Sequence, residues 1–130
     1  DQPHGGVVES LSGMALAEKQ LGLDSWVEHA TAVRLYIDER LRVSISLGSW
    51  PNLNANYALA RIAAVEDDVE RVVNHMQAAM KQNELEIQFF AVDPFFAELR
   101  DEPRLVEIAA EARSSALAER RKLRPVGAPN

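Results

Sequence analysis

Apolar residues recur at helical spacing in the first third of the chain, with polar residues between them. In the stretch 7–21 the apolar positions on one helical face are Val7, Leu11, Met14 and Leu21. Gly22 then stops this helix, and Asp24 or Ser25 can cap a second one. The apolar stripe of the second helix consists of Trp26, Ala30, Val33, Ile37 and Leu41. The pattern predicts a helical hairpin over residues 7–41.

The helical pattern breaks between residues 42 and 53. "VSIS" (43–46) alternates briefly, and the turn and cap residues in and just after this stretch are Gly48, Pro51, Asn52, Asn54 and Asn56. We therefore predict an extended linker over 42–53. A short strand at 43–46 is the minority alternative, because no second strand-like run is present to complete its ladder.

A second hairpin and a closing segment are expected after the linker. The pattern predicts helices at 54–64 and 67–82, and the apolar face of the latter comprises Val69, Val73, Met76 and Met80, flanked by Val72 and Ala79. Residues 84–92 predict a fifth short helix, and a last helix is expected to begin near Pro103. We thus expect a hairpin over 54–82, capping helices over 84–121 and a flexible tail at 125–130.

Composition and charge narrow the functional classes. The 130 residues fit one domain, 1–124, and 47% apolar with 26% charged residues is typical of a globular chain. The net charge is -6, although residues 113–130 carry five basic residues and only one acid. The rest of the chain is therefore more acidic than the total suggests, and a nucleic-acid surface is not expected there. Without cysteine, disulfides and thiol chemistry are excluded. No run reaches a membrane span, and the compartment stays open between cytoplasm, which is favoured, and periplasm.

The residue types of common catalytic and metal sites are present but scattered. His4, His29 and His75 have no partner at metal-ligand spacing, and Asp67-Asp68 falls at a helix start, where carboxylates serve as caps. No Gly-rich phosphate loop and no nucleophile motif occurs. We expect neither catalysis nor a cofactor.

The two hairpins resemble each other in sequence. "MALAEKQLGLD" (14–24) overlays "YALARIAAVED" (57–67) with an offset of 43 residues. Helical hairpins that repeat with such a period are typical of an α-solenoid, because each hairpin needs a neighbour to bury its apolar face. The expected fold is all-α, a short α-solenoid of antiparallel hairpins with about six helices.

The second hairpin and the segment after it resemble the tetratricopeptide repeat (TPR) family. Leu59-Ala60 and Ala79 match its large and small positions, whereas Glu84 replaces the closing proline. "FFAVDPFFAELRDEPRLVEI" (89–108) is similar to the ending that follows the last repeat in bacterial nucleotide cyclases, winged-helix regulators and kinases. The matching residues are Asp93, Pro94, Phe96, Leu99, Arg100, Pro103 and Arg104.

The Asp93-Pro94 pair explains part of this ending physically. Proline fits the first turn of a helix, and a preceding aspartate can accept the first free N–H groups. By the resemblance, Phe96 is the side chain that closes the end of the solenoid, whereas the resemblance gives Phe95 no role. Glu102 stands where the family has aspartate, so the second cap can shift to Asp101.

The resemblance implies a non-catalytic protein-interaction module, the C-terminal part of a larger bacterial signalling or transcription regulator. Its peptide or protein partner would lie in a groove formed by the first helix of each hairpin. The groove candidates are Met14, Glu18, Asn54, Tyr57 and Arg61.

Two alternatives from other classes stay open. The module can be a homodimerisation unit, with Trp26, Trp50 and Tyr36 as interface aromatics. It can also be a small-molecule sensor with a pocket near residues 46–54.

Overall fold

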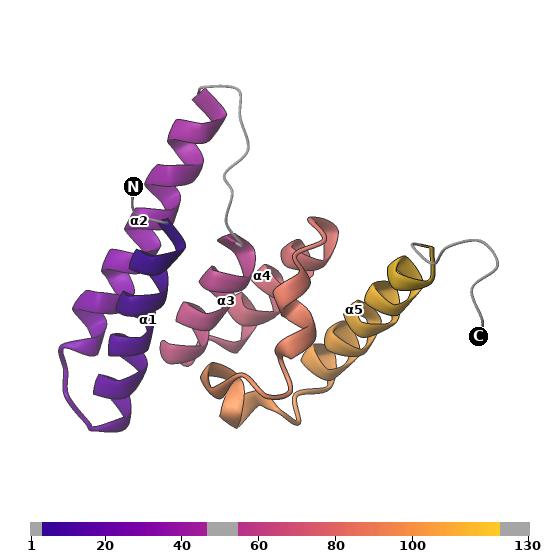
Figure 1. Cartoon of the computed structure of the whole chain (residues 1–130). Coiled ribbons are helices and arrows are strands. Elements are labelled where there is room, and N and C mark those ends of the chain that lie inside the picture. Colours follow the sequence, from indigo (N-terminus) through magenta and orange to yellow (C-terminus); the bar gives the residue numbers. More distant parts are fainter. Residues whose placement is uncertain (1–3, 47–54, 123–130) are drawn as a thin grey trace.

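The computed structural model describes residues 4–46 and 55–122, and this part of the chain is all-helical, without a strand. The expected all-α class is confirmed. The helices, in chain order, are α1 (His4–Gln20), α2 (Trp26–Ser46), α3 (Ala55–Val65), α4 (Val69–Lys81), the short 3₁₀-helices η1 (Leu85–Phe89) and η2 (Pro94–Leu99), and α5 (Pro103–Lys122). Figure 1 shows α1 and α2 on one side, α3 and α4 in the middle and α5 on the other side.

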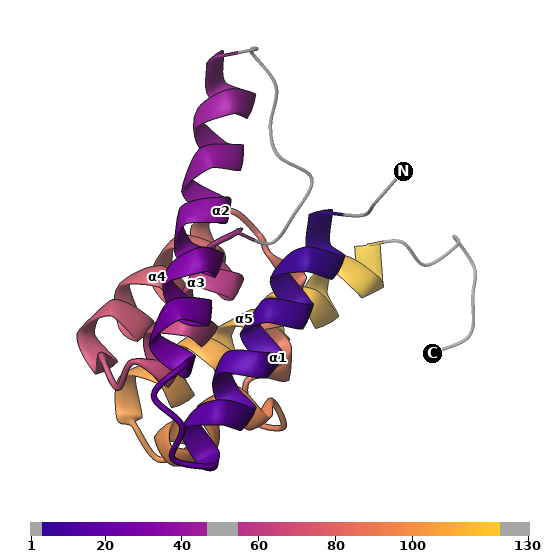
Figure 2. The ribbon, with the colours of Figure 1, turned by 90° about the vertical axis from the view of Figure 1, so that its left-hand side faces the viewer.

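The first hairpin consists of α1 and α2, which lie side by side in both ribbon views (Figures 1 and 2). Gly22 has a φ of +75°, and its N–H and that of Leu23 donate to the carbonyls of Lys19 and Glu18. This left-handed residue ends α1 and reverses the chain. The buried face of α1 consists of Val8, Ser12 and Ala15.

The stripe predicted for α1 is therefore displaced by about one residue. Met14 and Leu21, expected to be inward, are exposed. The stripe of α2 is confirmed, because Ala30, Val33 and Ile37 are fully buried and both ends of the stripe are partly buried.

The predicted start of the linker is wrong, because α2 continues to Ser46. Residues 43–46 are helical and form neither an extended chain nor a strand. The Arg42 guanidinium pairs with Glu39 one turn earlier, and the Ser46 hydroxyl donates to the carbonyl of Val43. Residues 47–53 of the predicted linker lie outside the described residues.

The second hairpin repeats the geometry of the first at its turn. Asp67 is left-handed at the end of α3 (φ +60°), and the Asp68 carboxylate accepts a hydrogen bond from the N–H of Arg71 at the start of α4. The inward side chains of α4 are those predicted: Val72, Val73, Met76 and Ala79 are buried, and Val69 and Met80 pack against them.

The offset between the hairpins differs between their first and second helices. Gly22 and Asp67 hold the same place in the turns and are 45 residues apart, as are the buried pair Ala15 and Ala60. In the second helices the predicted offset of 43 holds, since both Val33 and Met76 are buried. The turn of the first hairpin is therefore two residues longer, and the Ala-Leu-Ala overlay between the first helices is wrong by two positions.

The closing segment consists of two 3₁₀-helices and α5, and the short helix predicted within residues 84–92 is the 3₁₀-helix η1. The Asp93 carboxylate accepts a hydrogen bond from the N–H of Phe95, and Pro94 occupies the first turn of η2, as the sequence predicts. At the next joint the carboxylate of Glu102 accepts from the N–H of Arg104, so Glu102 and not Asp101 is the cap. Arg104 also pairs with Glu70 on α4, which connects the start of α5 with the second hairpin.

The buried side chains form two clusters that both include α3. One contains the α1 and α2 side chains with Ala55, Ile62 and Val65 of α3. The other contains the α4 and α5 side chains, Phe90 and Phe96 with Tyr57, Ala60 and Ala63 of α3. Helix α3 therefore presents one face to the first hairpin and another to the closing segment.

Candidate functional site

Helix α3, the first helix of the second hairpin, meets η2 at Asp93, which is 8% exposed. The Tyr57 hydroxyl on α3 donates to Asp93 Oδ2 at 2.5 Å, and the Phe95 N–H donates to Oδ1 at 3.0 Å. Arg100 Nη2 donates to the backbone carbonyl of Asp93 at 2.8 Å. One aspartate thus connects α3 with both ends of η2.

Arg61 extends this group of contacts to α1. Its Nε lies 3.2 Å from Asp93 Oδ2, its Nη1 donates to Glu9 Oε1 at 2.5 Å, and its guanidinium lies 4.1 Å from the centre of the Phe95 ring. The Phe95 ring, to which the sequence assigned no role, therefore packs against the Arg61 guanidinium. Arg61 is only 14% exposed, so most of its side chain belongs to this packing.

The environment of Tyr57 keeps its hydroxyl protonated. Burial, and then the hydrogen bond to the Asp93 carboxylate, raise the pKa of Tyr57 above its ordinary value of about 10. A phenol in this setting serves as a hydrogen-bond donor inside the fold and has no role as a base.

The predicted groove residues come together only in part. Tyr57 is 2% exposed and lies in the core, so it does not line an open groove. The Arg61 guanidinium already pairs with the carboxylates of Asp93 and Glu9. The Glu18 carboxylate is 2.6 Å from His29 Nδ1 within the first hairpin. Met14 is exposed, and Asn54 lies outside the described residues. Segment 93–96 itself covers the surface that Tyr57 and Arg61 were expected to offer a partner.

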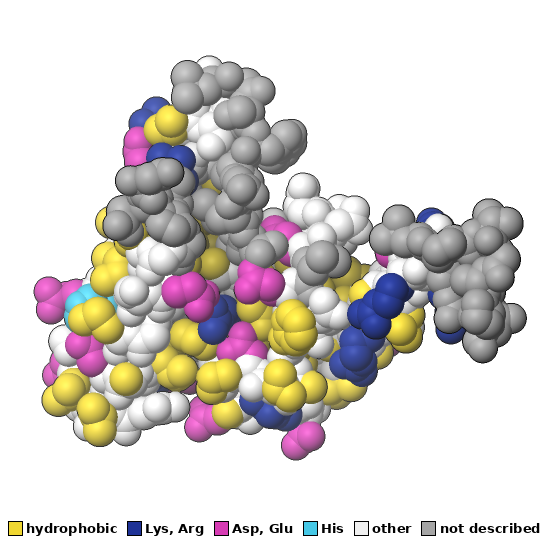
Figure 3. All heavy atoms as spheres, in the orientation of Figure 1, with side chains coloured by type: hydrophobic (Ala, Val, Ile, Leu, Met, Phe, Trp, Pro, Cys, Tyr) yellow, Lys and Arg dark blue, Asp and Glu magenta, His cyan; other side chains and the backbone are white. Residues whose placement is uncertain are grey.

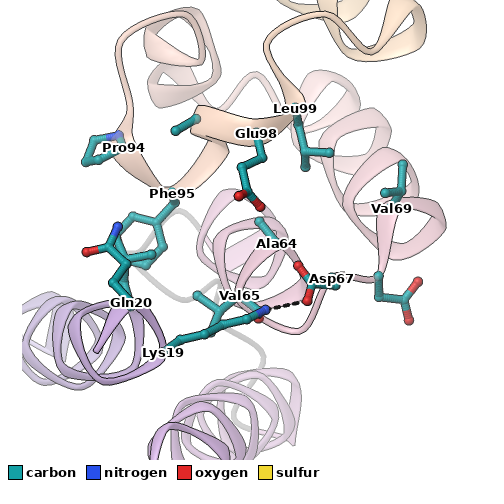
Figure 4. Close-up of a pocket in the computed structure, with 13 residues that line it drawn as sticks. Lys19, Gln20, Ala64, Val65, Asp67, Val69, Pro94, Phe95, Glu98 and Leu99 are labelled. Atoms are coloured by element: carbon teal, nitrogen blue, oxygen red, sulfur yellow. Dashed lines mark hydrogen bonds and ion pairs between the residues drawn. The ribbon is translucent and has the colours of Figure 1, made fainter. Parts of the chain in front are cut away.

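A cavity of about 330 Å³ opens beside this segment. It lies between the C-terminal ends of α1 and α3, the start of α4, and η2 (Figure 4). The lining residues, by element, are Leu16, Lys19 and Gln20; Ala64, Val65, Asp67, Asp68 and Val69; and Pro94, Phe95, Ala97, Glu98 and Leu99. Pro94 and Leu99 belong to the predicted structural motif and Lys19 is adjacent to the predicted groove residue Glu18, but none of the lining residues was predicted to bind a partner.

One edge of the cavity already holds an ammonium group. The Lys19 Nζ donates to the backbone carbonyl of Val65 and to Asp67 Oδ2, the latter at 2.6 Å. It also lies 5.0 Å from the centre of the Trp26 ring. The C-terminal end of α3 and the carboxylate just beyond it thus form a cation-binding edge.

The opposite wall carries a carboxylate with no partner among the described residues. Glu98 of η2 is exposed and extends over the cavity toward Ala64 and Asp67 (Figure 4). In the view of Figure 3 a group of Lys and Arg side chains lies over α5, whereas the hairpins carry Asp and Glu side chains together with further Lys and Arg side chains.

Glu84 is a further structurally important residue that sequence reasoning did not recognise. Its carboxylate accepts hydrogen bonds from the N–H groups of Asn56 and Tyr57, at 3.3 and 2.9 Å, and from the side-chain amide of Asn56 at 2.9 Å. A residue at the end of the second hairpin thus satisfies the free amides at the start of α3. The only signal in the sequence was the replacement of the family's closing proline by an acid.

The described residues show neither a metal site nor a membrane span. In residues 4–46 and 55–122 no three His, Asp or Glu side chains are placed to hold a metal ion, and no helix combines the length and apolar character needed to cross a bilayer. Comparisons with protein-family models, curated proteins and solved structures found no match to this chain.

Proposed function

We propose that this chain is a non-catalytic protein-interaction module, a short TPR-like solenoid that serves as the C-terminal part of a larger bacterial regulator. The observation that carries the proposal is the open cavity where the first helices of both hairpins meet η2. Such a seam between repeated hairpins is where solenoid proteins offer a continuous surface to partners.

The arrangement of the helices supports the TPR-like part of the proposal. Each hairpin ends its first helix at a left-handed residue, Gly22 or Asp67, and buries an alanine, Ala15 or Ala60, at equivalent places. A small residue at these positions allows the two helices of a hairpin to approach closely. The ending that begins at Asp93-Pro94 then covers the last hairpin with Phe96, which is fully buried.

Peptide-display selection on the isolated chain tests the proposal. We expect selection to converge on a peptide family that binds one site per chain. Ala64→Leu, which adds bulk to the cavity floor, is expected to reduce binding of that family, whereas Ala110→Leu on the exposed face of α5 leaves binding unchanged. Failure to enrich any peptide above an unrelated helical protein would contradict the interaction function.

Homodimerisation is the second candidate, and a specific observation favours it. The first hairpin exposes four aliphatic side chains, Leu21, Leu23, Val27 and Leu35, with exposed fractions from 49% to 74%. Trp26 and Tyr36, the aromatics expected at such an interface, are instead partly buried in the hairpin, and Trp50 lies outside the described residues. Sedimentation equilibrium of the parent chain and of its Leu35→Glu variant tests this candidate. If the parent chain is a monomer and Leu35→Glu does not change its mass, homodimerisation is contradicted.

The small-molecule sensor remains the third alternative. Its predicted pocket at residues 46–54 lies almost wholly outside the described residues, and no described contact favours it.

A further inference from the structure

We infer that the cavity between α1, α3 and η2 accepts a cationic side chain with an aliphatic stem, that is, an arginine or lysine of a partner peptide that is flanked by apolar residues. The inference rests on the proposed interaction function and specifies the chemistry of the ligand.

The interior of the cavity suits the stem of such a side chain. Eight of its lining side chains carry no polar group: Leu16, Ala64, Val65, Val69, Pro94, Phe95, Ala97 and Leu99. Apolar contact with the methylene groups of lysine or arginine removes area from water, while the charged head remains near the rim.

The rim suits the charged head. Three carboxylates, on Asp67, Asp68 and Glu98, surround the cavity against the single ammonium of Lys19. The C-terminal ends of α1 and α3 also line it, and the partial negative charge of helix C-termini favours a cation. The bound Lys19 ammonium demonstrates that preference within the chain itself.

Glu98 is the carboxylate most available to an incoming cation. Asp67 already pairs with Lys19, and Asp68 accepts the backbone N–H of Arg71. Glu98 has no such partner among the described residues and faces the cavity from η2 (Figure 4).

The start of α4 does not offset this preference. A helix N-terminus attracts anions through its free amides. Here the Asp68 carboxylate caps α4 and supplies the negative charge locally. The Asp68 carboxylate, which also lies 4.0 Å from Arg71 Nε, therefore offsets the attraction of these amides for an anion.

The size of the cavity points to one side chain of a larger partner. A volume of about 330 Å³ is at the low end of the range of roughly 300–1,000 Å³ that holds whole small ligands. An anchor residue within a peptide fits this volume, with its flanking apolar side chains left to contact the exposed parts of the rim.

A pair of short peptides tests the inference. The probes are acetyl-Gly-Leu-Arg-Leu-Gly-amide and its neutral counterpart with Gln in place of Arg, titrated into the isotope-labelled chain and followed by NMR. We expect the Arg peptide to shift the backbone amides of residues 64–69 and 95–99 and to bind about tenfold more tightly than the Gln peptide.

Charge variants on the chain complete the test. Glu98→Gln is expected to lower the affinity for the Arg peptide about threefold, and Glu98→Lys about tenfold. Neither variant is expected to change the affinity for the Gln peptide. Glu111→Lys on the exposed face of α5 makes the same charge change away from the cavity and is expected to alter affinity by less than about twofold. Equal binding of both peptides, equal effects of the variants at 98 and 111, or shifts confined to other residues would overturn the inference.

The outcome is separable from that of the interaction function. If display selection converges on peptides that lack a basic residue and ignore Glu98→Gln, the cation preference is wrong while the interaction function stands. If selection converges on peptides with a basic residue that lose affinity on Glu98→Gln, both are supported.

Discussion

The first and second hairpins share the same kind of turn but bury different side chains. The buried members of the first hairpin's cluster are small and aliphatic residues, and the aromatic side chains that pack against them, Trp26, Tyr36 and Phe95, are only partly buried. The cluster of the second hairpin includes three rings, in which Phe96 contacts Tyr57 edge to face at 5.7 Å between centroids and Phe90 at 5.2 Å. Aromatic rings bury more area per residue.

From this difference we expect the second half of the molecule to contribute more of the free energy of unfolding than the first. The closing segment contributes Phe90, Phe96 and Leu105 to the second hairpin, whereas nothing in the described residues covers the outer side of α2. Because α3 belongs to both clusters, the first hairpin packs on a helix whose position depends on the closing segment. Loss of the closing contacts is therefore expected to affect both hairpins, but unequally.

Phe96→Ala is expected to have the largest effect. Removal of this fully buried ring, which contacts the rings of Tyr57 and Phe90, is expected to lower the free energy of unfolding by about 3–5 kcal/mol, measured by urea denaturation. Hydrogen exchange should show the greatest loss of protection in η2 and α5, with a smaller loss in α1 and α2. Phe89→Ala, at a side chain that is 53% exposed, is the matched control and should cost below about 1 kcal/mol. Equal costs for the two variants would contradict the central role of Phe96.

Tyr57→Phe is expected to lower the free energy of unfolding by less than Phe96→Ala at neutral pH, and also to change how that free energy depends on pH. Loss of the hydrogen bond to Asp93 costs about 1–2 kcal/mol at pH 7. The pKa of Tyr57 is raised in the folded state, so its contribution is complete below about pH 10 and is lost as the pH rises further, by up to about 1.4 kcal/mol per unit. The variant should therefore lose less stability than the parent chain between about pH 10 and 11.5. An equally steep decline in both would show that Tyr57 ionises as freely in the folded state.

Local signals account for what the sequence predicted correctly. The inward face of α4 follows from apolar spacing, and the joint at Asp93-Pro94 follows from two adjacent residues with known turn preferences. Burial of Phe96 was expected through the family resemblance. These features depend on residues within one or two turns of each other.

The features that the sequence did not predict depend on contacts between residues far apart in the chain, or on a helix that continues through a stretch with a weak local pattern. The contacts of Glu84 and Asp93 with Tyr57 join residues 27 and 36 positions apart, which no local pattern reveals. Tyr57 was assigned to an open groove because nothing in the sequence showed that segment 93–96 would cover it. Residues 43–46 remain helical because brief alternation carries little weight when a helix is already formed and no strand is available for pairing.

Glu84→Gln tests how far the start of α3 depends on the end of the second hairpin. The change keeps the size of the side chain but removes the charge from hydrogen bonds to two backbone amides, so we expect a loss of about 1 kcal/mol. Glu107→Gln, on the exposed face of α5, should change the free energy of unfolding by less than about 0.5 kcal/mol. Indistinguishable values for the two variants would mean that other groups satisfy the amides of α3.

Gly13→Ala is expected to give the smallest effect and to strengthen the weaker hairpin. Gly13 lies inside α1 on an exposed position, and a Cβ there would meet no atom within 4 Å. Alanine therefore raises the free energy of unfolding by about 0.5–1 kcal/mol through helix propensity and a less flexible unfolded chain. Gly22→Ala is the contrasting control, because its φ of +75° makes alanine unfavourable by about 1–2 kcal/mol. If Gly13→Ala instead destabilises the chain, and more so at high protein concentration, α1 must approach a second copy closely at Gly13, which would favour the homodimer over the monomeric interaction module.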